Sequence, residues 1–157
     1  MNLNEKAKSI TRPAIHFAYV EKIGPFMQTA QKAWLQLNKA LSALGKSNKI
    51  TGKLSLFKMT PKETLQVGVS LAAKPAKLPR GLKYARVPGG HYARFVLTGP
   101  YSDLPMAWAR VFELVDKKKL ELRPTFCIEH YVSDGDATPE AELITEILVP
   151  TREVKRA

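Results

Sequence analysis

The sequence has little of the residue types that often define a protein class at once. It holds a single cysteine, Cys127, among 157 residues, which excludes a disulfide within the chain and a multi-cysteine zinc site. Its three histidines, His16, His91 and His130, lie far apart and show no metal-ligand spacing. We therefore expect no metal, and we interpret Cys127 as a core or pocket-lining residue.

Long apolar runs are also missing. The longest, around VGVSLAA, falls well short of the roughly 18 residues that a membrane-spanning helix needs. The opening MNLNEKAKSI is too polar for a signal peptide. No phosphate-binding glycine loop and no Gly-x-Ser-x-Gly elbow occur, which argues against a nucleotide and against a serine nucleophile. We expect a cytoplasmic protein without cofactor or membrane insertion.

Acidic residues are scarce in the first half of the chain. Residues 1–80 hold 14 Lys or Arg against 3 Asp or Glu, whereas residues 81–157 hold 11 of each, so the whole net charge of +11 lies in the first half. Most of these cations are lysines without an arginine cluster, which favours diffuse charge over phosphate readout. Binding of nucleic acid or another polyanion stays open as an alternative. The lysines concerned are Lys32, Lys39, Lys46, Lys49 and Lys53.

The chain reads as two copies of one pattern, about residues 12–75 and 88–150. Each copy opens with an alternating strand that ends in a Gly-Pro-aromatic turn, at Gly24 to Phe26 and at Gly99 to Tyr101. An amphipathic helix follows, then a lysine-rich connection and two strands. We predict an α+β fold of two strand-helix-strand-strand repeats with pseudo-twofold symmetry, forming one domain over residues 1–157.

Two stretches lie outside this pattern. About a dozen residues precede the first expected strand, and residues 72–84, AAKPAKLPRGLKY, are interpreted as a linker or edge between the copies. The expected total is six strands and two helices.

Glu146 is an anomaly in the last expected strand. Because strand side chains alternate, it shares a face with Ile144 and Leu148, so its carboxylate is paired, protonated or awaiting a partner. A surface salt bridge is the simplest alternative. Aligning the two copies puts Gly68 opposite Glu146, which leaves space beside an acid. Aromatic residues that could wall such a space are Phe17, Tyr19, Trp34, Tyr92, Phe95, Trp108, Phe126 and Tyr131.

At this point the sequence resembles a known family. The stretches TGPYSDLPMAWARVFELV and TFCIEHYVSDGDATPEAELITEILVP are similar to the GyrI-like small-molecule-binding domain, which is also the effector-binding domain of multidrug-responsive transcription regulators. The resemblance implies two repeats around a central cleft. It matches Glu146 to a buried acid that binds cationic, lipophilic compounds, and Glu129, His130 and Tyr131 to an acid, a spacer and a tyrosine.

The leading hypothesis is a stand-alone binding module with a regulatory or sequestering role, which captures an apolar or cationic aromatic compound around Glu146. The expected ligand-binding residues are Glu146, Tyr131, Trp108, Tyr92, Phe17, Tyr19, Phe126 and Gly68. One alternative is a hydrolase of reactive electrophiles that uses Glu146 as general acid or base with Tyr131. Another is a gyrase-inhibitor-like interaction protein acting through the basic first half. Because no helix-turn-helix is expected, we do not expect sequence-specific DNA recognition.

Overall fold

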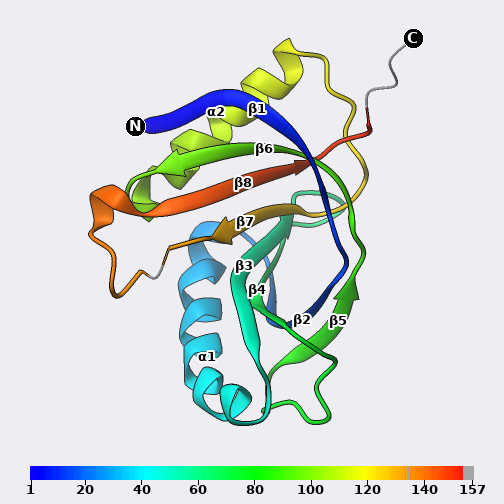
Figure 1. The fold of residues 1–157 in the computed structure, drawn as a ribbon, viewed down its shortest axis with the longest axis vertical. Coiled ribbons are helices and arrows are strands. Elements are labelled where there is room, and N and C mark those ends of the chain that lie inside the picture. The colour runs from blue at the N-terminus through cyan, green and yellow to red at the C-terminus, as the bar shows by residue number, and fades with distance from the viewer. Residues whose placement is uncertain (134, 154–157) are drawn as a thin grey trace. The chain divides into compact units, whose positions relative to one another are not determined.

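The chain folds into strands and helices of mixed α+β class, as predicted. The computed structural model describes residues 1–133 and 135–153, which contain eight β-strands and two α-helices (Figure 1). Their contacts divide into two units. The N-terminal unit is residues 13–89, and the C-terminal unit combines residues 1–12 with the chain from residue 90 onward.

The N-terminal unit is a four-stranded antiparallel sheet with one helix. Its elements are β2 (Ile15–Ile23), α1 (Phe26–Ser47), β3 (Ile50–Lys58), β4 (Thr64–Leu71) and β5 (Lys83–Val87), and its strand order is β3-β4-β2-β5. Helix α1 follows the turn at Gly24, whose φ of 130° suits a glycine. The helix buries Ala33, Leu37 and Leu44 against Val67 of β4 and its neighbours.

The C-terminal unit repeats this order of elements. It contains β6 (Gly90–Thr98), a 3-10 turn at Tyr101–Asp103, α2 (Leu104–Lys117), β7 (Cys127–Tyr131), a second 3-10 turn at Glu140–Glu142 and β8 (Ile144–Pro150). With β1 (Asn2–Arg12), the antiparallel strand order is β1-β6-β8-β7. The last strand of each repeat pairs with the other two: β4 pairs with β2 and β3, and β8 pairs with β6 and β7. The twofold relation between the copies stays a prediction.

Two strands were not expected from the sequence, so the total of six strands was wrong. Strand β1 occupies the segment before the first repeat, and β5 lies partly inside the segment interpreted as a linker or edge. Each pairs with one neighbour only in its unit's strand order, and β1 keeps most of its side chains in solvent. Edge strands need no apolar alternation on two faces, and natural proteins place charged residues there. Both segments therefore lack the pattern that reveals a strand.

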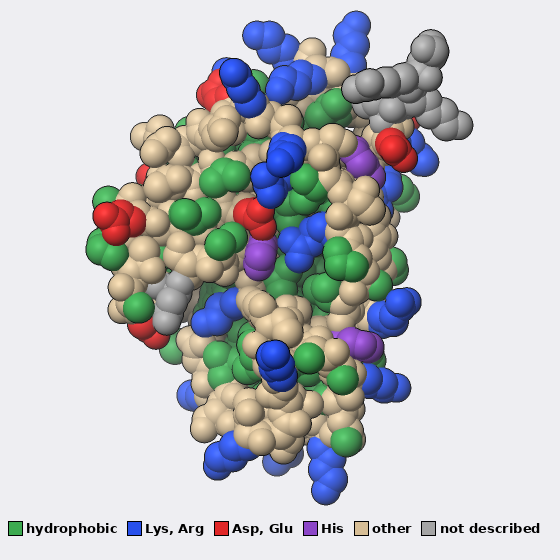
Figure 2. All heavy atoms as spheres, in the orientation of Figure 1, with side chains coloured by type: hydrophobic (Ala, Val, Ile, Leu, Met, Phe, Trp, Pro, Cys, Tyr) green, Lys and Arg blue, Asp and Glu red, His purple; other side chains and the backbone are tan. Residues whose placement is uncertain are grey.

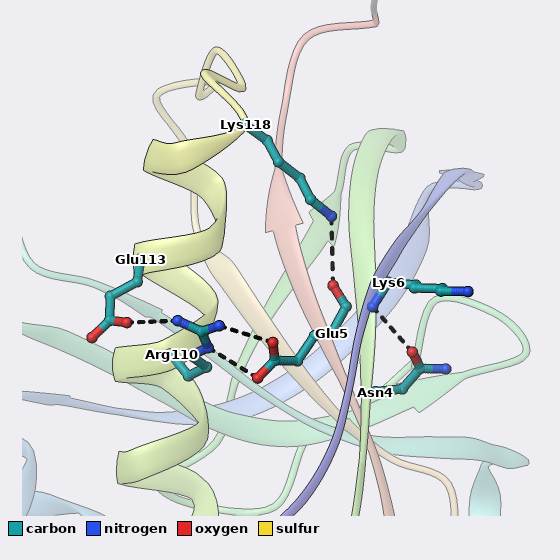
Figure 3. Close-up of polar contacts among 6 residues, drawn as sticks. All are labelled: Asn4, Glu5, Lys6, Arg110, Glu113 and Lys118. Atoms are coloured by element: carbon teal, nitrogen blue, oxygen red, sulfur yellow. Dashed lines mark hydrogen bonds and ion pairs between the residues drawn. The ribbon is translucent and has the colours of Figure 1, made fainter.

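Charged contacts attach β1 to α2 (Figure 3). The guanidinium of Arg110 donates from Nε and Nη2 to the two carboxylate oxygens of Glu5, at 2.9 Å each, and from Nη1 to Glu113 at 2.9 Å. The hydrogen bonds from Arg110 hold the pKa of Glu5 below its ordinary value. Lys118, just after α2, reaches the Glu5 carbonyl at 3.5 Å. These contacts help to position the end of α2. None of the described helices is long and apolar enough to cross a membrane.

Candidate functional site

The sheet of the C-terminal unit has two chemically different faces, each with a carboxylate. Strand pairing places Glu129 beside Ile147 and His130 beside Glu146, and successive side chains point to opposite faces. Glu129 and Ile147 therefore lie on the side covered by α2, where the helix buries Trp108, Val111 and Leu114. Glu146 and His130 lie on the other side.

Glu129 is held by two aromatic donors. The indole Nε1 of Trp108 donates to Oε2 at 2.6 Å, and the hydroxyl of Tyr131 donates to Oε1 at 2.6 Å. Among the described residues no cation forms an ion pair with this carboxylate. Burial raises the pKa of Glu129, although the hydrogen bonds from Tyr131 and Trp108 act in the opposite sense. The site thus holds a carboxylate that is costly to ionise.

Partly exposed aromatic rings border this carboxylate cluster. Tyr101 packs edge-on against Tyr131 with ring centroids 5.4 Å apart, and Phe112 lies 5.5 Å from Trp108. Both outer rings keep more than a third of their surface in solvent. Cys127 lies on the same face of β7, and burial raises the pKa of its thiol to about 12, so it is a poor nucleophile. The arrangement offers an aromatic wall around an acid.

Glu146 is different because it already has a cationic partner, Arg94, and a histidine donor, His130. His130 donates from Nδ1 to Oε1 at 2.7 Å, and Arg94 of β6 donates from Nη1 to Oε2 at 3.1 Å. Its side chain is 18% exposed. The hydrogen bond from His130 is the main cause of a lowered pKa of Glu146, and the charges of Arg94 and Arg12 act in the same sense. This is the paired state that the sequence left open.

The expected grouping around Glu146 therefore needs correction. Tyr131 and Trp108 bind Glu129 on the helix side of the sheet, not Glu146. Tyr92 does share the Glu146 face, since it pairs with Pro150 of β8, and it is 3% exposed. Phe126 immediately precedes β7 and is partly buried. The expectation failed because two acids in apolar strands look alike until the register of the strands is known.

The remaining expected residues, Phe17, Tyr19 and Gly68, lie in the N-terminal unit. Phe17 and Tyr19 stack in β2 with centroids 5.2 Å apart, and Gly68 of β4 pairs with Tyr19. A Cβ at Gly68 would lie 2.2 Å from the carbonyl oxygen of Ala18 and 2.8 Å from Cα of Tyr19. Close approach of two strands thus accounts for this glycine without a ligand. Burial raises the pKa of Tyr19.

Several residues of the two clusters were not selected from the sequence. Arg94 and Phe112 carried no signal, because an arginine in an alternating strand and a phenylalanine on an amphipathic helix are ordinary. Tyr101 was visible only as the last residue of the Gly-Pro-aromatic turn. Glu129 and His130 entered through the family resemblance alone.

Comparison with known proteins assigns the chain to a family. The model of the GyrI-like small-molecule-binding domain matches residues 8–152. The chain therefore belongs to the GyrI-like family of small-molecule-binding domains. No sequence among the curated proteins matches it.

Solved structures share the fold at low sequence identity. The C-terminal domain of EcmrR is 15% identical with a TM-score of 0.80, over 95% of this chain and 98% of that one. SAV2435, solved with bound tetraphenylphosphonium, is 15% identical with a TM-score of 0.75, over 94% of each chain. A hydrolase from Listeria innocua is 15% identical with a TM-score of 0.60, over 94% of this chain and 92% of that one.

Proposed function

We propose that this domain binds a lipophilic, positively charged small molecule, with Glu129 as the residue that recognises the charge. The proposal rests on a difference between the hydrogen-bond partners of Glu129 and those of Glu146. Within residues 1–133 and 135–153, Glu129 receives hydrogen bonds from neutral donors only, whereas Glu146 is paired with His130 and Arg94. An ionised carboxylate in a partly buried place is costly without a cation. A cationic ligand would supply that missing charge.

The surrounding rings suit the same class of ligand. Aromatic faces attract cations and provide apolar area. Trp108 and Tyr131 contact the carboxylate, and Phe112 and Tyr101 pack against these two rings. The outer pair, Tyr101 and Phe112, is partly exposed, which offers a route by which a flat or propeller-shaped aromatic cation could reach the inner pair. That SAV2435 was solved with an aromatic phosphonium is consistent with this chemistry.

The proposed role is capture without turnover, for sensing or for sequestration of the compound. A hydrolase is the second candidate, and a specific observation favours it. Tyr131 and Glu129 are joined by a hydrogen bond, and burial raises the pKa of Glu129, so this carboxyl group holds a proton more readily than an exposed one and could serve as a general acid. Product formed from a bound electrophile, and lost in Glu129→Gln, would select this second function.

The test compares methyltriphenylphosphonium with neutral triphenylphosphine oxide, which has similar aromatic bulk without the charge. Isothermal titration of the wild type, of Glu129→Gln and of the control Glu146→Gln gives the affinities. A charge-assisted contact is typically worth about 1.5 to 3 kcal/mol, so Glu129→Gln should weaken binding of the cation by about tenfold to a hundredfold. Binding of the oxide should change little in either variant.

Two outcomes would contradict the assignment to Glu129. If Glu129→Gln binds the cation as well as the wild type does, this carboxylate does not recognise the charge. If Glu146→Gln loses the cation while Glu129→Gln retains it, the site lies on the opposite face of the sheet, around the acid that the sequence favoured. Melting temperatures of both free variants show whether either substitution unfolds the protein.

A further inference from the structure

A basic recess lies in the C-terminal unit, and none of its lining residues belongs to the Glu129 cluster. It is an open pocket of about 800 Å³. It is formed where α2 ends, where β6 begins and where the chain leaves β8, with His91, Lys118, Lys119, Arg123, Thr151 and Arg152 in its lining. In the orientation of Figure 2, Lys and Arg side chains gather along the upper margin, over the end of α2. Its volume is in the range of ordinary small-molecule sites.

Arg123 is held in a fixed position in the lining of this basic pocket. Its Nε donates to the carbonyl oxygens of His91 at 3.2 Å and Thr151 at 3.1 Å, and its Nη2 donates to the His91 carbonyl at 2.6 Å. Its guanidinium also lies 4.9 Å from the centre of the Tyr92 ring. These contacts fix a partly buried cation in one orientation, which lowers the entropic cost of using it to bind an anion.

The place of the guanidinium depends on Gly90. A Cβ at Gly90 would lie 2.7 Å from Nη1 of Arg123 and 2.8 Å from its Cζ, so another residue there would displace the group. Within residues 1–133 and 135–153, Arg123 forms no ion pair with a carboxylate, and Nη1 makes no hydrogen bond. A positive charge with an unused donor therefore borders the pocket.

Neighbouring cations add to this charge. Lys118, Lys119 and Arg152 line the same pocket, against the carboxylates of Glu121 and Glu153. Arg152 approaches Glu121 at 3.7 Å, with both side chains largely exposed, so this ion pair is weak. Lys119 has a φ of 52°, which turns the chain sharply after α2. Lysines at the end of a helix also stabilise its dipole, but Arg123 lies beyond the helix and has no such role.

From this arrangement we propose that the basic pocket binds a small molecule bearing a phosphate group. A fixed guanidinium with a free N–H, together with the ammonium groups of Lys118 and Lys119, matches the several oxygen acceptors of a dianionic phosphate. The volume exceeds what inorganic phosphate alone would fill, so the natural ligand is an organic phosphate, and the same chemistry could be presented by a nucleic-acid backbone. This site is independent of Glu129 and gives the domain a second, anionic ligand.

The experiment uses inorganic phosphate and pyrophosphate as probes, with binding followed by amide chemical shifts. We expect saturable shifts in the amides of residues 90–91, 118–123 and 151–152 at constant ionic strength. Lys119→Asn removes one charge, and asparagine tolerates the positive φ at this position. It should weaken phosphate binding by about threefold to tenfold. Arg123→Lys keeps the net charge but loses the planar fork, and it should weaken binding at least as much.

Lys77→Asn is the matched control, because it removes an exposed lysine of the N-terminal unit and changes the net charge by the same amount. It should leave the affinity for phosphate unchanged. The proposal is overturned if neither probe shifts these amides, or if Lys77→Asn and Lys119→Asn weaken binding equally, since the effect would then be one of net charge. It is also overturned in favour of nucleic acid if a short DNA duplex binds through Lys119 while both small probes have no effect.

Discussion

At the scale of single residues, the two glutamates of the C-terminal sheet should respond to pH in opposite ways. Burial raises the pKa of Glu129, so the folded state holds its proton more tightly than the unfolded chain does. Stability is then lost as the pH rises from about 4.5 through the raised pKa. For Glu146 the folded pKa is lowered, mainly by His130, so stability is present above about 4.5 and is lost as the pH falls.

The test is urea unfolding of Glu129→Gln and Glu146→Gln between about pH 3 and pH 8. As the pH rises from about 4.5 through the raised pKa of Glu129, the free energy of unfolding of Glu129→Gln should increase relative to that of the wild type. Glu146→Gln should cost about 1 to 2 kcal/mol near neutral pH, because Arg94 loses its anionic partner and one of the two acceptor oxygens becomes an NH2 group, and it should cost less in acid. A difference for Glu129→Gln that is the same at every pH would show that this carboxyl group titrates normally.

The partners of Glu129 and Glu146 could not be predicted from the sequence. Both Glu129 and Glu146 sit in apolar strands, and alternation alone shows only that each shares a face with apolar neighbours. The partner of Glu146, Arg94, is 52 positions away, and the two meet because β6 pairs with β8 in one register. Register depends on packing of the whole sheet and is not written in either strand. Membership of a small-molecule-binding family was predictable, but which partners each acid meets was not.

At the scale of elements, periodicity predicted the regular parts well. Both helices and the strands that follow them appear where turns and alternation placed them, because their buried faces need a regular apolar pattern. The exceptions lie at helix ends and sheet edges. Met27, an apolar residue in the first turn of α1, is fully exposed, and β1 and β5 lack apolar alternation because each borders a single strand.

Close packing of β4 on β2 gives a prediction at the same scale. Gly68→Ala should destabilise the protein by about 1 to 3 kcal/mol or more, because its Cβ would overlap the backbone of Ala18 and Tyr19, which cannot rotate away. Gly45→Ala in α1 is the matched control. Its Cβ would meet Ile50 at an ordinary 3.7 Å, and alanine favours helix by about 0.5 to 1 kcal/mol. Urea unfolding of both variants should show shifts of opposite sign; a destabilised Gly45→Ala or a neutral Gly68→Ala contradicts this.

At the scale of the whole molecule, charge is distributed as unevenly in the structure as in the sequence. The N-terminal unit carries the five lysines that suggested polyanion binding, and all five are exposed: Lys32, Lys39 and Lys46 on α1, Lys49 just after it and Lys53 on β3. Lys53 also lies 5.8 Å from the centre of the Trp34 ring. Exposed lysines without a fixed geometry attract phosphates but do not select among them.

We therefore expect DNA binding by this lysine face to be weak, independent of sequence and strongly dependent on salt. Each phosphate contact by lysine releases counterions, so the logarithm of affinity should fall with the logarithm of salt concentration at a slope of about −0.9 per contact. Replacing Lys32, Lys39 and Lys46 with Gln should reduce the steepness of that slope by up to about 3 units, measured by fluorescence anisotropy with a labelled duplex. Binding of methyltriphenylphosphonium should be unaffected, because Glu129 lies in the other unit. A slope that does not change in the triple variant would place any DNA contact outside α1, and a parallel loss of phosphonium binding would show that the two activities share one surface.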